Sequence, residues 1–107
     1  MSERVAVGVD AGGTSTRAVV SEHGALAGSA EGGGANPTTL GIENAADVIL
    51  SVVRKALDHR RPDALVIGAA GAGRPAMAEA LAALVGSAFP DARCVVEDDT
   101  AIALRMV

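Results

Sequence analysis

Hydrophobic positions at the start of the chain recur with a period of two. The run 5–9 alternates valine with alanine or glycine, which predicts a half-buried strand that ends at Asp10. After a Gly-Gly turn, an apolar run over 18–20 predicts a returning strand, and a weaker run over 26–31 predicts a third. These segments predict a three-stranded antiparallel meander.

The later part of the chain has the longer period of helices, interrupted by short apolar runs. Apolar residues spaced for one helical face predict a helix over 42–58, followed by cations and by Pro62. The further expected elements are a buried strand over 64–69, a glycine loop over 68–75, a helix from Pro75 to about Gly86, a strand over 93–96 and the start of a helix over 101–107. This order predicts an α/β fold: one mixed five-stranded sheet of three antiparallel strands and parallel βαβ units, with helices on both faces.

Composition and charge narrow the class of protein. The 107 residues suffice for one domain and stop within an apolar pattern, so we expect 1–107 to be the N-terminal domain of a longer protein, cut within its third helix. The net charge of -4 and the scattered basic residues argue against a nucleic-acid partner. The single Cys94 excludes an internal disulfide and fits a reducing cytoplasm. No stretch reaches transmembrane length, so we expect no membrane partner.

The turn between the first two strands carries the clearest chemical signal. Asp10 precedes two glycines, and the hydroxyls of Thr14, Ser15 and Thr16 follow. Glycines let a ligand approach the backbone, and the N–H groups of such a turn can bind an anion. Asp10 would repel a phosphate but could hold a hydrated Mg²⁺ that bridges to it. The alternative is an ordinary hairpin with polar turn residues, and the turn alone does not decide between the two.

Two later loops place small or polar residues where a ligand could reach them. Asn36 is the second residue after three consecutive glycines, and Pro37 restricts it to an extended conformation, so its amide either faces a polyhydroxylated ligand or belongs to a plain turn. The loop over 68–75, which contains Gly71, follows a predicted parallel strand. Open α/β sheets bind ligands at that edge, and a close-packed crossover is the alternative.

Carboxylates gather after the last predicted strand, at Glu97, Asp98 and Asp99. One aspartate is expected to cap the helix that follows. Another could be a general base that accepts the proton of a hydroxyl nucleophile, as phosphoryl transfer to an alcohol requires. Capping alone is the alternative for either aspartate.

Taken in order, these features resemble the ribonuclease H-like (actin-like ATPase) N-terminal domain of the sugar kinase, Hsp70 and actin superfamily. The segment V-G-V-D-A-G-G-T over 7–14 is similar to that superfamily's first phosphate-contacting motif. Within it, the chain resembles the N-acetylglucosamine kinase and BadF/BadG/BcrA/BcrD ATPase family. That family pairs G-G-T with a Gly-Gly-x-Asn loop, a glycine-rich strand end and a strand closing in Asp. The resemblance covers essentially the whole chain.

The resemblance implies ATP and Mg²⁺ as cofactors and a role for several single residues. Asp10 would organise Mg²⁺, through water, while Asn36 and Gly71 would contact the sugar. Asp99 would be the catalytic base, with Asp98 as the alternative because the two are adjacent. The ATP phosphates would be bound by the turn residues Gly12, Gly13, Thr14 and Ser15.

The implied function is ATP-dependent phosphorylation of an amino sugar, N-acetylglucosamine or glucosamine, by in-line transfer. The family's other nucleotide motifs lie in a C-terminal domain, so we expect this chain to need that domain and to be inactive alone. The sequence does not decide whether the protein forms a homodimer. One alternative is an ATPase that activates an iron–sulfur dehydratase or reductase, for which Cys94 alone supplies too few cluster ligands. Another is a non-catalytic sugar- or nucleotide-sensing module.

Overall fold

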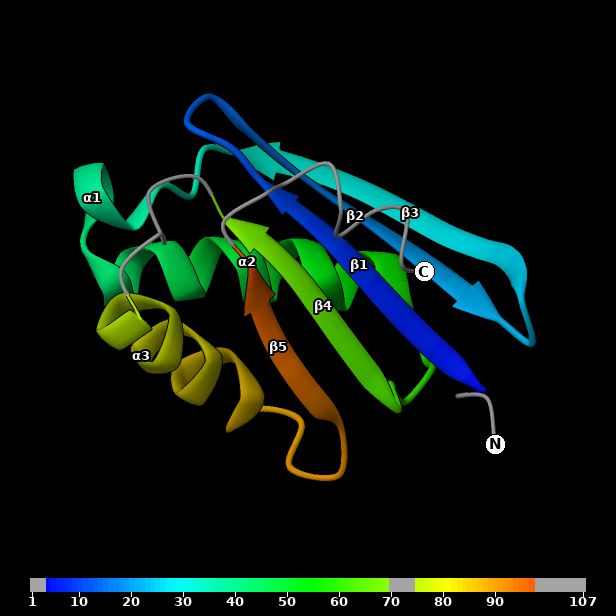
Figure 1. The fold of residues 1–107 in the computed structure, drawn as a ribbon. Helices are drawn as coiled ribbons and strands as arrows, with labels where there is room; N and C mark the ends of the chain where they lie inside the picture. Colours follow the sequence, from blue (N-terminus) through cyan, green and yellow to red (C-terminus); the bar gives the residue numbers. More distant parts are fainter. Residues whose placement is uncertain (1–3, 70–74, 98–107) are drawn as a thin grey trace.

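Five strands form one mixed sheet in the order β3-β2-β1-β4-β5 (Figure 1). The computed structural model describes residues 4–69 and 75–97. The neighbours β1–β2 and β2–β3 are antiparallel, whereas β1–β4 and β4–β5 are parallel, which confirms the predicted meander and parallel units. The strands are β1 (Val5–Ala11), β2 (Ser15–Glu22), β3 (Ala25–Gly33), β4 (Ala64–Ala69) and β5 (Arg93–Glu97).

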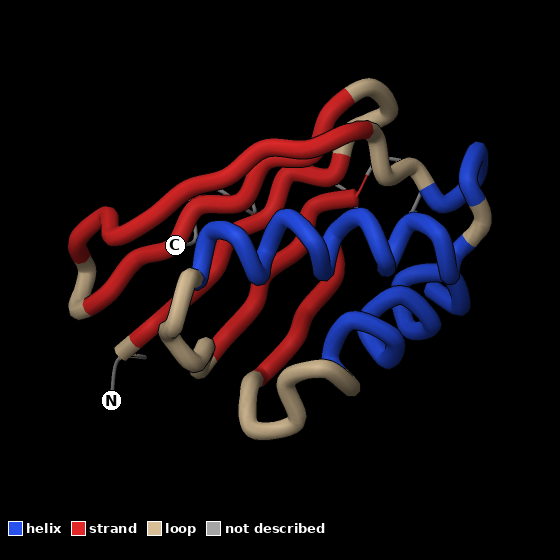
Figure 2. Tube along the Cα trace, turned by 180° about the vertical axis from the view of Figure 1, so that it is seen from behind, coloured by secondary structure: helices blue, strands red, loops and turns tan. Residues whose placement is uncertain are grey.

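Within the described residues, three helices accompany the sheet: α1 (Pro37–Leu40), α2 (Ile42–Leu57) and α3 (Pro75–Gly86). The two long helices, α2 and α3, pack side by side on one face of the sheet (Figure 2). The helix expected over 101–107 lies outside the described residues. None of the described helices has the length and apolar character needed to cross a membrane.

The core lies between α2 and the sheet. Residues of α2 at helical spacing are buried, among them Ile49, Val53 and Leu57, as the periodicity predicts. The opposing face of the sheet is buried too, including Val7 and Ile67, which have no exposed surface. Burying a side chain of this size stabilises the fold by about 1.5–3 kcal/mol, so this interface holds α2 on one face of the sheet.

Strand β3 runs further than the sequence predicts. The expected loop over 32–37 is wrong for its first two residues, because Gly32 and Gly33 pair with β2 and belong to the strand. A Cβ on Gly32 would lie 2.6 Å from Cγ2 of Val52 on α2, and one on Gly28 would collide with the carbonyl oxygen of Ala56. Glycine is therefore present in this strand because α2 packs closely against it.

Candidate active site

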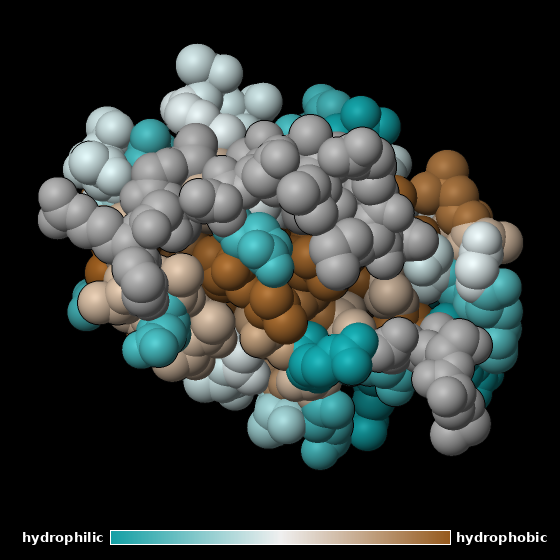
Figure 3. Space-filling view, viewed as in Figure 1, coloured by the Kyte–Doolittle hydropathy of each residue, from teal (hydrophilic) through white to brown (hydrophobic). Residues whose placement is uncertain are grey.

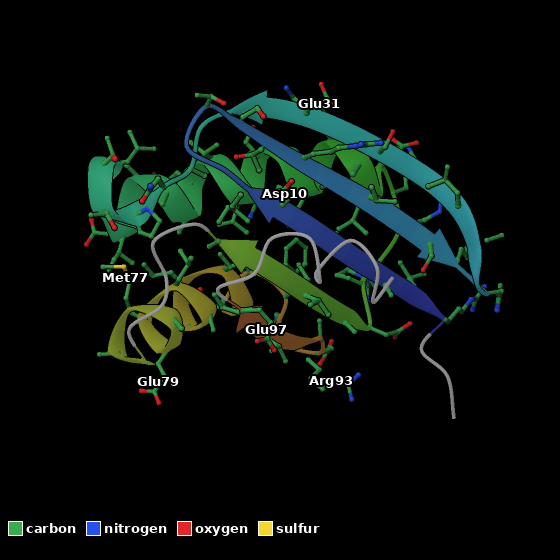
Figure 4. The ribbon with its side chains drawn as sticks, turned by 45° about the horizontal axis from the view of Figure 1, so that its top comes forward. Asp10, Glu31, Met77, Glu79, Arg93 and Glu97 are labelled. Atoms are coloured by element: carbon green, nitrogen blue, oxygen red, sulfur yellow. The ribbon has the colours of Figure 1, made fainter. Side chains whose placement is uncertain are left out.

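A row of mostly charged positions crosses the whole sheet at the carboxyl end of its parallel strands. Asp10 on β1 pairs with Arg17 on β2 and with Gly68 on β4. The row continues through Arg17 to Glu31 on β3 and through Gly68 to Glu97 on β5. Paired residues point to the same side of a sheet, and here that side faces away from α2 and α3 (Figure 4). Three carboxylates and one guanidinium thus lie in one row across this end of the sheet.

An apolar row borders the charged row, two residues earlier on β1, β4 and β5 and two residues later on the antiparallel β2. Val19, Gly8, Val66 and Val95 are paired in this order across β2, β1, β4 and β5. Val95 keeps 38% of its surface exposed, and hydrophobic side chains are visible in the middle of this face (Figure 3). The charged row is therefore the polar margin of a largely apolar surface.

The turn between β1 and β2 presents backbone donors at this edge. The N–H of Gly12 donates to the carbonyl oxygen of Ser15 at 2.9 Å, which closes the turn. The carbonyl oxygen of Gly12 accepts from the N–H of Ala35, also at 2.9 Å. The exposed Gly13 and Thr14 donate no backbone hydrogen bond to any described residue. Two consecutive N–H groups are thus free to bind an anion.

The three hydroxyls of the turn separate by exposure. Thr14 and Ser15 are exposed, so their hydroxyl groups can reach a ligand at the turn. Thr16 points to the other side of β2 and is fully buried, and its Oγ1 has no hydrogen-bond partner among the described residues. The predicted contact residues Thr14 and Ser15 are therefore exposed, whereas Thr16 belongs to the interior.

Asp10 fits a magnesium ion that is shared with a ligand. Its half-buried carboxylate accepts no hydrogen bond from the described part of the chain. Within that part, no group of three or more His, Cys, Asp or Glu side chains could hold a metal by itself. Mg²⁺ commonly uses one or two carboxylates, keeps several waters and takes its other ligands from phosphates. The donor set suits an ion that arrives with phosphate.

Asn36 has a structural task and a spare donor group. Its Oδ1 accepts from the N–H of Thr38 at 2.9 Å and caps α1. Its Nδ2 donates to no described residue. The two readings of the sequence, turn residue and ligand contact, are therefore compatible, because the cap uses the oxygen and leaves the NH₂ group available.

The end of β5 lies at the same edge as the turn. Glu97 is two strands away from Asp10, a separation of about 10 Å at the usual strand spacing (Figure 4). Asp98 and Asp99, the two candidates for a general base, lie outside the described residues, as does Gly71. Strand β5 is described as far as Glu97, which lies at the same end of the sheet as Asp10.

Cys94 belongs to the other side of β5. It packs against the core beside Gly86 of α3, and burial raises the pKa of its thiol to about 11. The thiol is therefore protonated at neutral pH and is a poor metal ligand or nucleophile.

Comparison with known proteins gives these features a context. A profile of the BadF/BadG/BcrA/BcrD ATPase family matches residues 7–106. The chain belongs to this family. No curated protein matches the chain. Membership of an ATPase family implies ATP binding, and the turn with two free N–H groups beside Asp10 is the described feature that suits the phosphates.

Two solved structures share the fold of this family member. One, from Chromobacterium violaceum, is provisionally named an N-acetylglucosamine kinase; it is 25% identical, with a TM-score of 0.69 over 87% of this chain. The other, from Porphyromonas gingivalis, has the same provisional name; at 22% identity and a TM-score of 0.70 over 86% of the chain, it shows the fold alone. The chain spans about a third of each, 34% and 32%. The fold is that of an actin-like ATPase N-terminal domain.

Proposed function

We propose that this chain forms the phosphate- and acceptor-binding part of an ATP-dependent kinase whose substrate is an amino sugar, N-acetylglucosamine or glucosamine. The observation that carries the proposal is a contact between two loops. The turn with free N–H groups is hydrogen-bonded, through Gly12 and Ala35, to the loop that carries Asn36. The proposed phosphate site and the proposed acceptor site would thus be neighbours, as group transfer between them requires.

The proposed reaction is an in-line displacement. A sugar hydroxyl oxygen attacks the γ-phosphorus of ATP, the bond from that phosphorus to the β–γ bridging oxygen breaks, and ADP leaves. The hydroxyl proton passes to the carboxylate of Asp99, or of Asp98 as the alternative. The N–H groups of Gly13 and Thr14 would hold phosphate oxygens. Bound Mg²⁺, held by Asp10 through water, would offset the negative charge of the phosphates.

The direct test uses the full-length protein that contains this chain, supplied with MgATP and either sugar. ATP consumption should depend on the sugar, and Asp99→Asn should abolish turnover while the dissociation constant for the sugar stays within about twofold. Asp98→Asn is the matched control for the adjacent carboxylate. Hydrolysis of ATP at the same rate without any sugar would contradict the proposed function.

Asn36 offers a second test, because its two roles can be separated. Asn36→Asp keeps a capping oxygen but removes both N–H donors, whereas Asn36→Ala removes the cap as well. Both variants should raise the sugar KM about tenfold and leave the ATP KM unchanged, because one buried hydrogen bond is worth roughly 1–3 kcal/mol. Only Asn36→Ala should also lose stability, by about 1 kcal/mol. An unchanged sugar KM in both variants would remove Asn36 from the site.

The activator of an iron–sulfur enzyme is the second candidate from this family. Such a protein needs thiolate ligands for its cluster, and this chain contributes one cysteine whose thiol is partly buried and protonated at neutral pH. Hydrolysis of ATP that depends on an iron–sulfur partner protein rather than on a sugar would favour this candidate.

A further inference from the structure

Gly34, in the segment that follows β3, packs closely against the β1–β2 turn. We call residues 12–14 of that turn the phosphate turn, and the segment that carries Asn36 the acceptor loop. A Cβ atom on Gly34 would collide with the carbonyl oxygen of Gly13 and would lie 2.8 Å from its carbonyl carbon and 3.3 Å from the nitrogen of Thr14. All three are backbone atoms, so no side chain can rotate away to make room. The next residue, Ala35, donates its N–H to the carbonyl oxygen of Gly12. Two successive residues thus tie this segment to the turn.

The need for glycine at this position is a need for space. Within the described residues, positive φ angles of glycine occur at Gly24 and Gly41, so Gly34 has a backbone conformation that other residues adopt freely. An added side chain would fail here because the turn occupies its place. Pushing that turn away would move the N–H groups of Gly13 and Thr14, which are the free donors of the site.

The three consecutive glycines have three different surroundings. A Cβ on Gly32 would meet a core side chain, that of Val52, at 2.6 Å. A Cβ on Gly33 would meet nothing within 4 Å, and one on Gly34 would meet the phosphate turn. Substitutions of Gly32, where a Cβ would contact the core, and of Gly33, where it would contact nothing within 4 Å, are therefore matched controls for a substitution of Gly34, where it would contact the turn.

We propose that Gly34 is a positioning residue that locks the acceptor loop onto the phosphate turn, so that the two binding sites keep a fixed separation. The role of the acceptor loop rests on the proposed function, since Asn36 stands two residues further along. The contact between Gly34 and the turn does not depend on a sugar, so the affinity for MgATP alone is enough to test it. Displacement of the turn by a side chain at Gly34 weakens binding of MgATP even when no sugar is present.

The experiment compares Gly32→Ala, Gly33→Ala and Gly34→Ala in the full-length protein, with MgATP affinity measured by calorimetry in the absence of sugar. Gly34→Ala should raise the Kd for MgATP at least tenfold, whereas Gly33→Ala stays within twofold of the unsubstituted protein. Gly32→Ala should lower the melting temperature and leave the Kd within twofold. Folded Gly34→Ala protein with an unchanged Kd would overturn the proposal, and so would an equal loss of affinity in Gly32→Ala.

A second measurement needs no substitution and decides the matter if Gly34→Ala does not fold. Amide hydrogen exchange of Ala35 reports on its bond to Gly12. Addition of MgATP should slow exchange at Ala35 together with Gly13 and Thr14; slowing at the turn with no change at Ala35 would overturn the proposal. Neither measurement uses a sugar. A protein that binds MgATP but phosphorylates no amino sugar would therefore end the proposed function without touching this inference.

Discussion

The two hairpin turns of the β1-β2-β3 meander both contain glycine, for different reasons. At the β2–β3 turn, His23 and Gly24 have φ angles of 52° and 82°, as in the type I′ turns that close two-residue hairpins. At the β1–β2 turn, Gly12 and Gly13 have no such positive φ, and a Cβ on Gly13 would meet no protein atom within 4 Å. The positive φ angle of Gly24 therefore requires glycine at that position, whereas neither the φ angle nor the packing of Gly13 does.

The difference teaches where to look for a ligand. A glycine that neither the backbone conformation nor the packing requires is explained when something outside the protein has to come close to it. At the β1–β2 turn, the free N–H groups and the Asp10 carboxylate fit the phosphate ligand that we propose. At the β2–β3 turn both residues are exposed and the strands are simply joined.

Substitutions of the carboxylates near the two turns should show the largest difference in their effect on kcat/KM. Asp10→Asn should lower kcat/KM for ATP by about 100-fold or more, because electrostatic groups aimed at developing charge contribute on that scale. Glu22→Gln is the control beside the other turn; it removes a partly exposed ion pair with Arg60 at 3.4 Å and should cost at most about 1 kcal/mol of stability. Steady-state kinetics of both variants check this. Equal effects on kcat/KM would erase the distinction between the turns.

The glycines themselves give the next largest effect. Gly13→Ala should raise the Kd for MgATP about tenfold, the loss expected for one hydrogen bond to a charged group, with little change in the free energy of unfolding. Gly24→Ala should do the reverse: about 1 kcal/mol less stability, because alanine is strained at φ 82°, and an unchanged Kd. Calorimetry and urea unfolding measure the two quantities. A Gly13→Ala protein that is destabilised but binds normally would contradict the account.

Thr16, which lies on β2 next to the turn, sharpens the comparison. Its hydroxyl is fully buried and unpaired within the described residues, so Thr16→Val should raise the free energy of unfolding by about 1 kcal/mol and leave MgATP affinity unchanged. Urea unfolding with a parallel binding measurement tests this. Weaker MgATP binding in Thr16→Val would show instead that the hydroxyl serves the site.

A structural feature can be predicted from the sequence when the residues that cause it are close to it in the chain. The bounds of β4 and α3 are predicted because Pro75, Gly86 and short apolar runs act over a few residues. The strand character of Gly32 is missed because its cause, contact with Val52, lies 20 positions away by subtraction of 32 from 52. Helix α1 is missed as well, because the Asn36-Pro37 pair by itself predicts an extended turn or loop.

The site follows the same division. The turn over 10–15 is recognisable from its composition, and the structure brings it together with the loop of Asn36. The alignment of Asp10 with Glu97 follows from strand register, which glycine counts and periodicity do not determine. The lock at Gly34 depends on the path of two loops in space, so nothing in the local sequence distinguishes this glycine from Gly33.

The smallest expected effect concerns the helix-covered side of the sheet. Burial raises the pKa of the Cys94 thiol above its ordinary value of 9.0, to about 11, so the folded state keeps a proton that the unfolded state loses between these values. Stability should therefore be unaffected by this group below pH 9 and should fall as the pH rises from 9 to 11. Cys94→Ala should remove that part of the decline in urea unfolding. Parallel pH curves for the two proteins would contradict the assigned burial.

The central claim is that the β1–β2 turn binds phosphate, and a structure of the full-length protein with Mg²⁺ and a non-hydrolysable ATP analogue tests it most directly. Phosphate oxygens should lie about 2.7–3.2 Å from the backbone nitrogens of Gly13 and Thr14, with the ion one water away from Asp10. Phosphates bound elsewhere, with both N–H groups facing solvent, would contradict it.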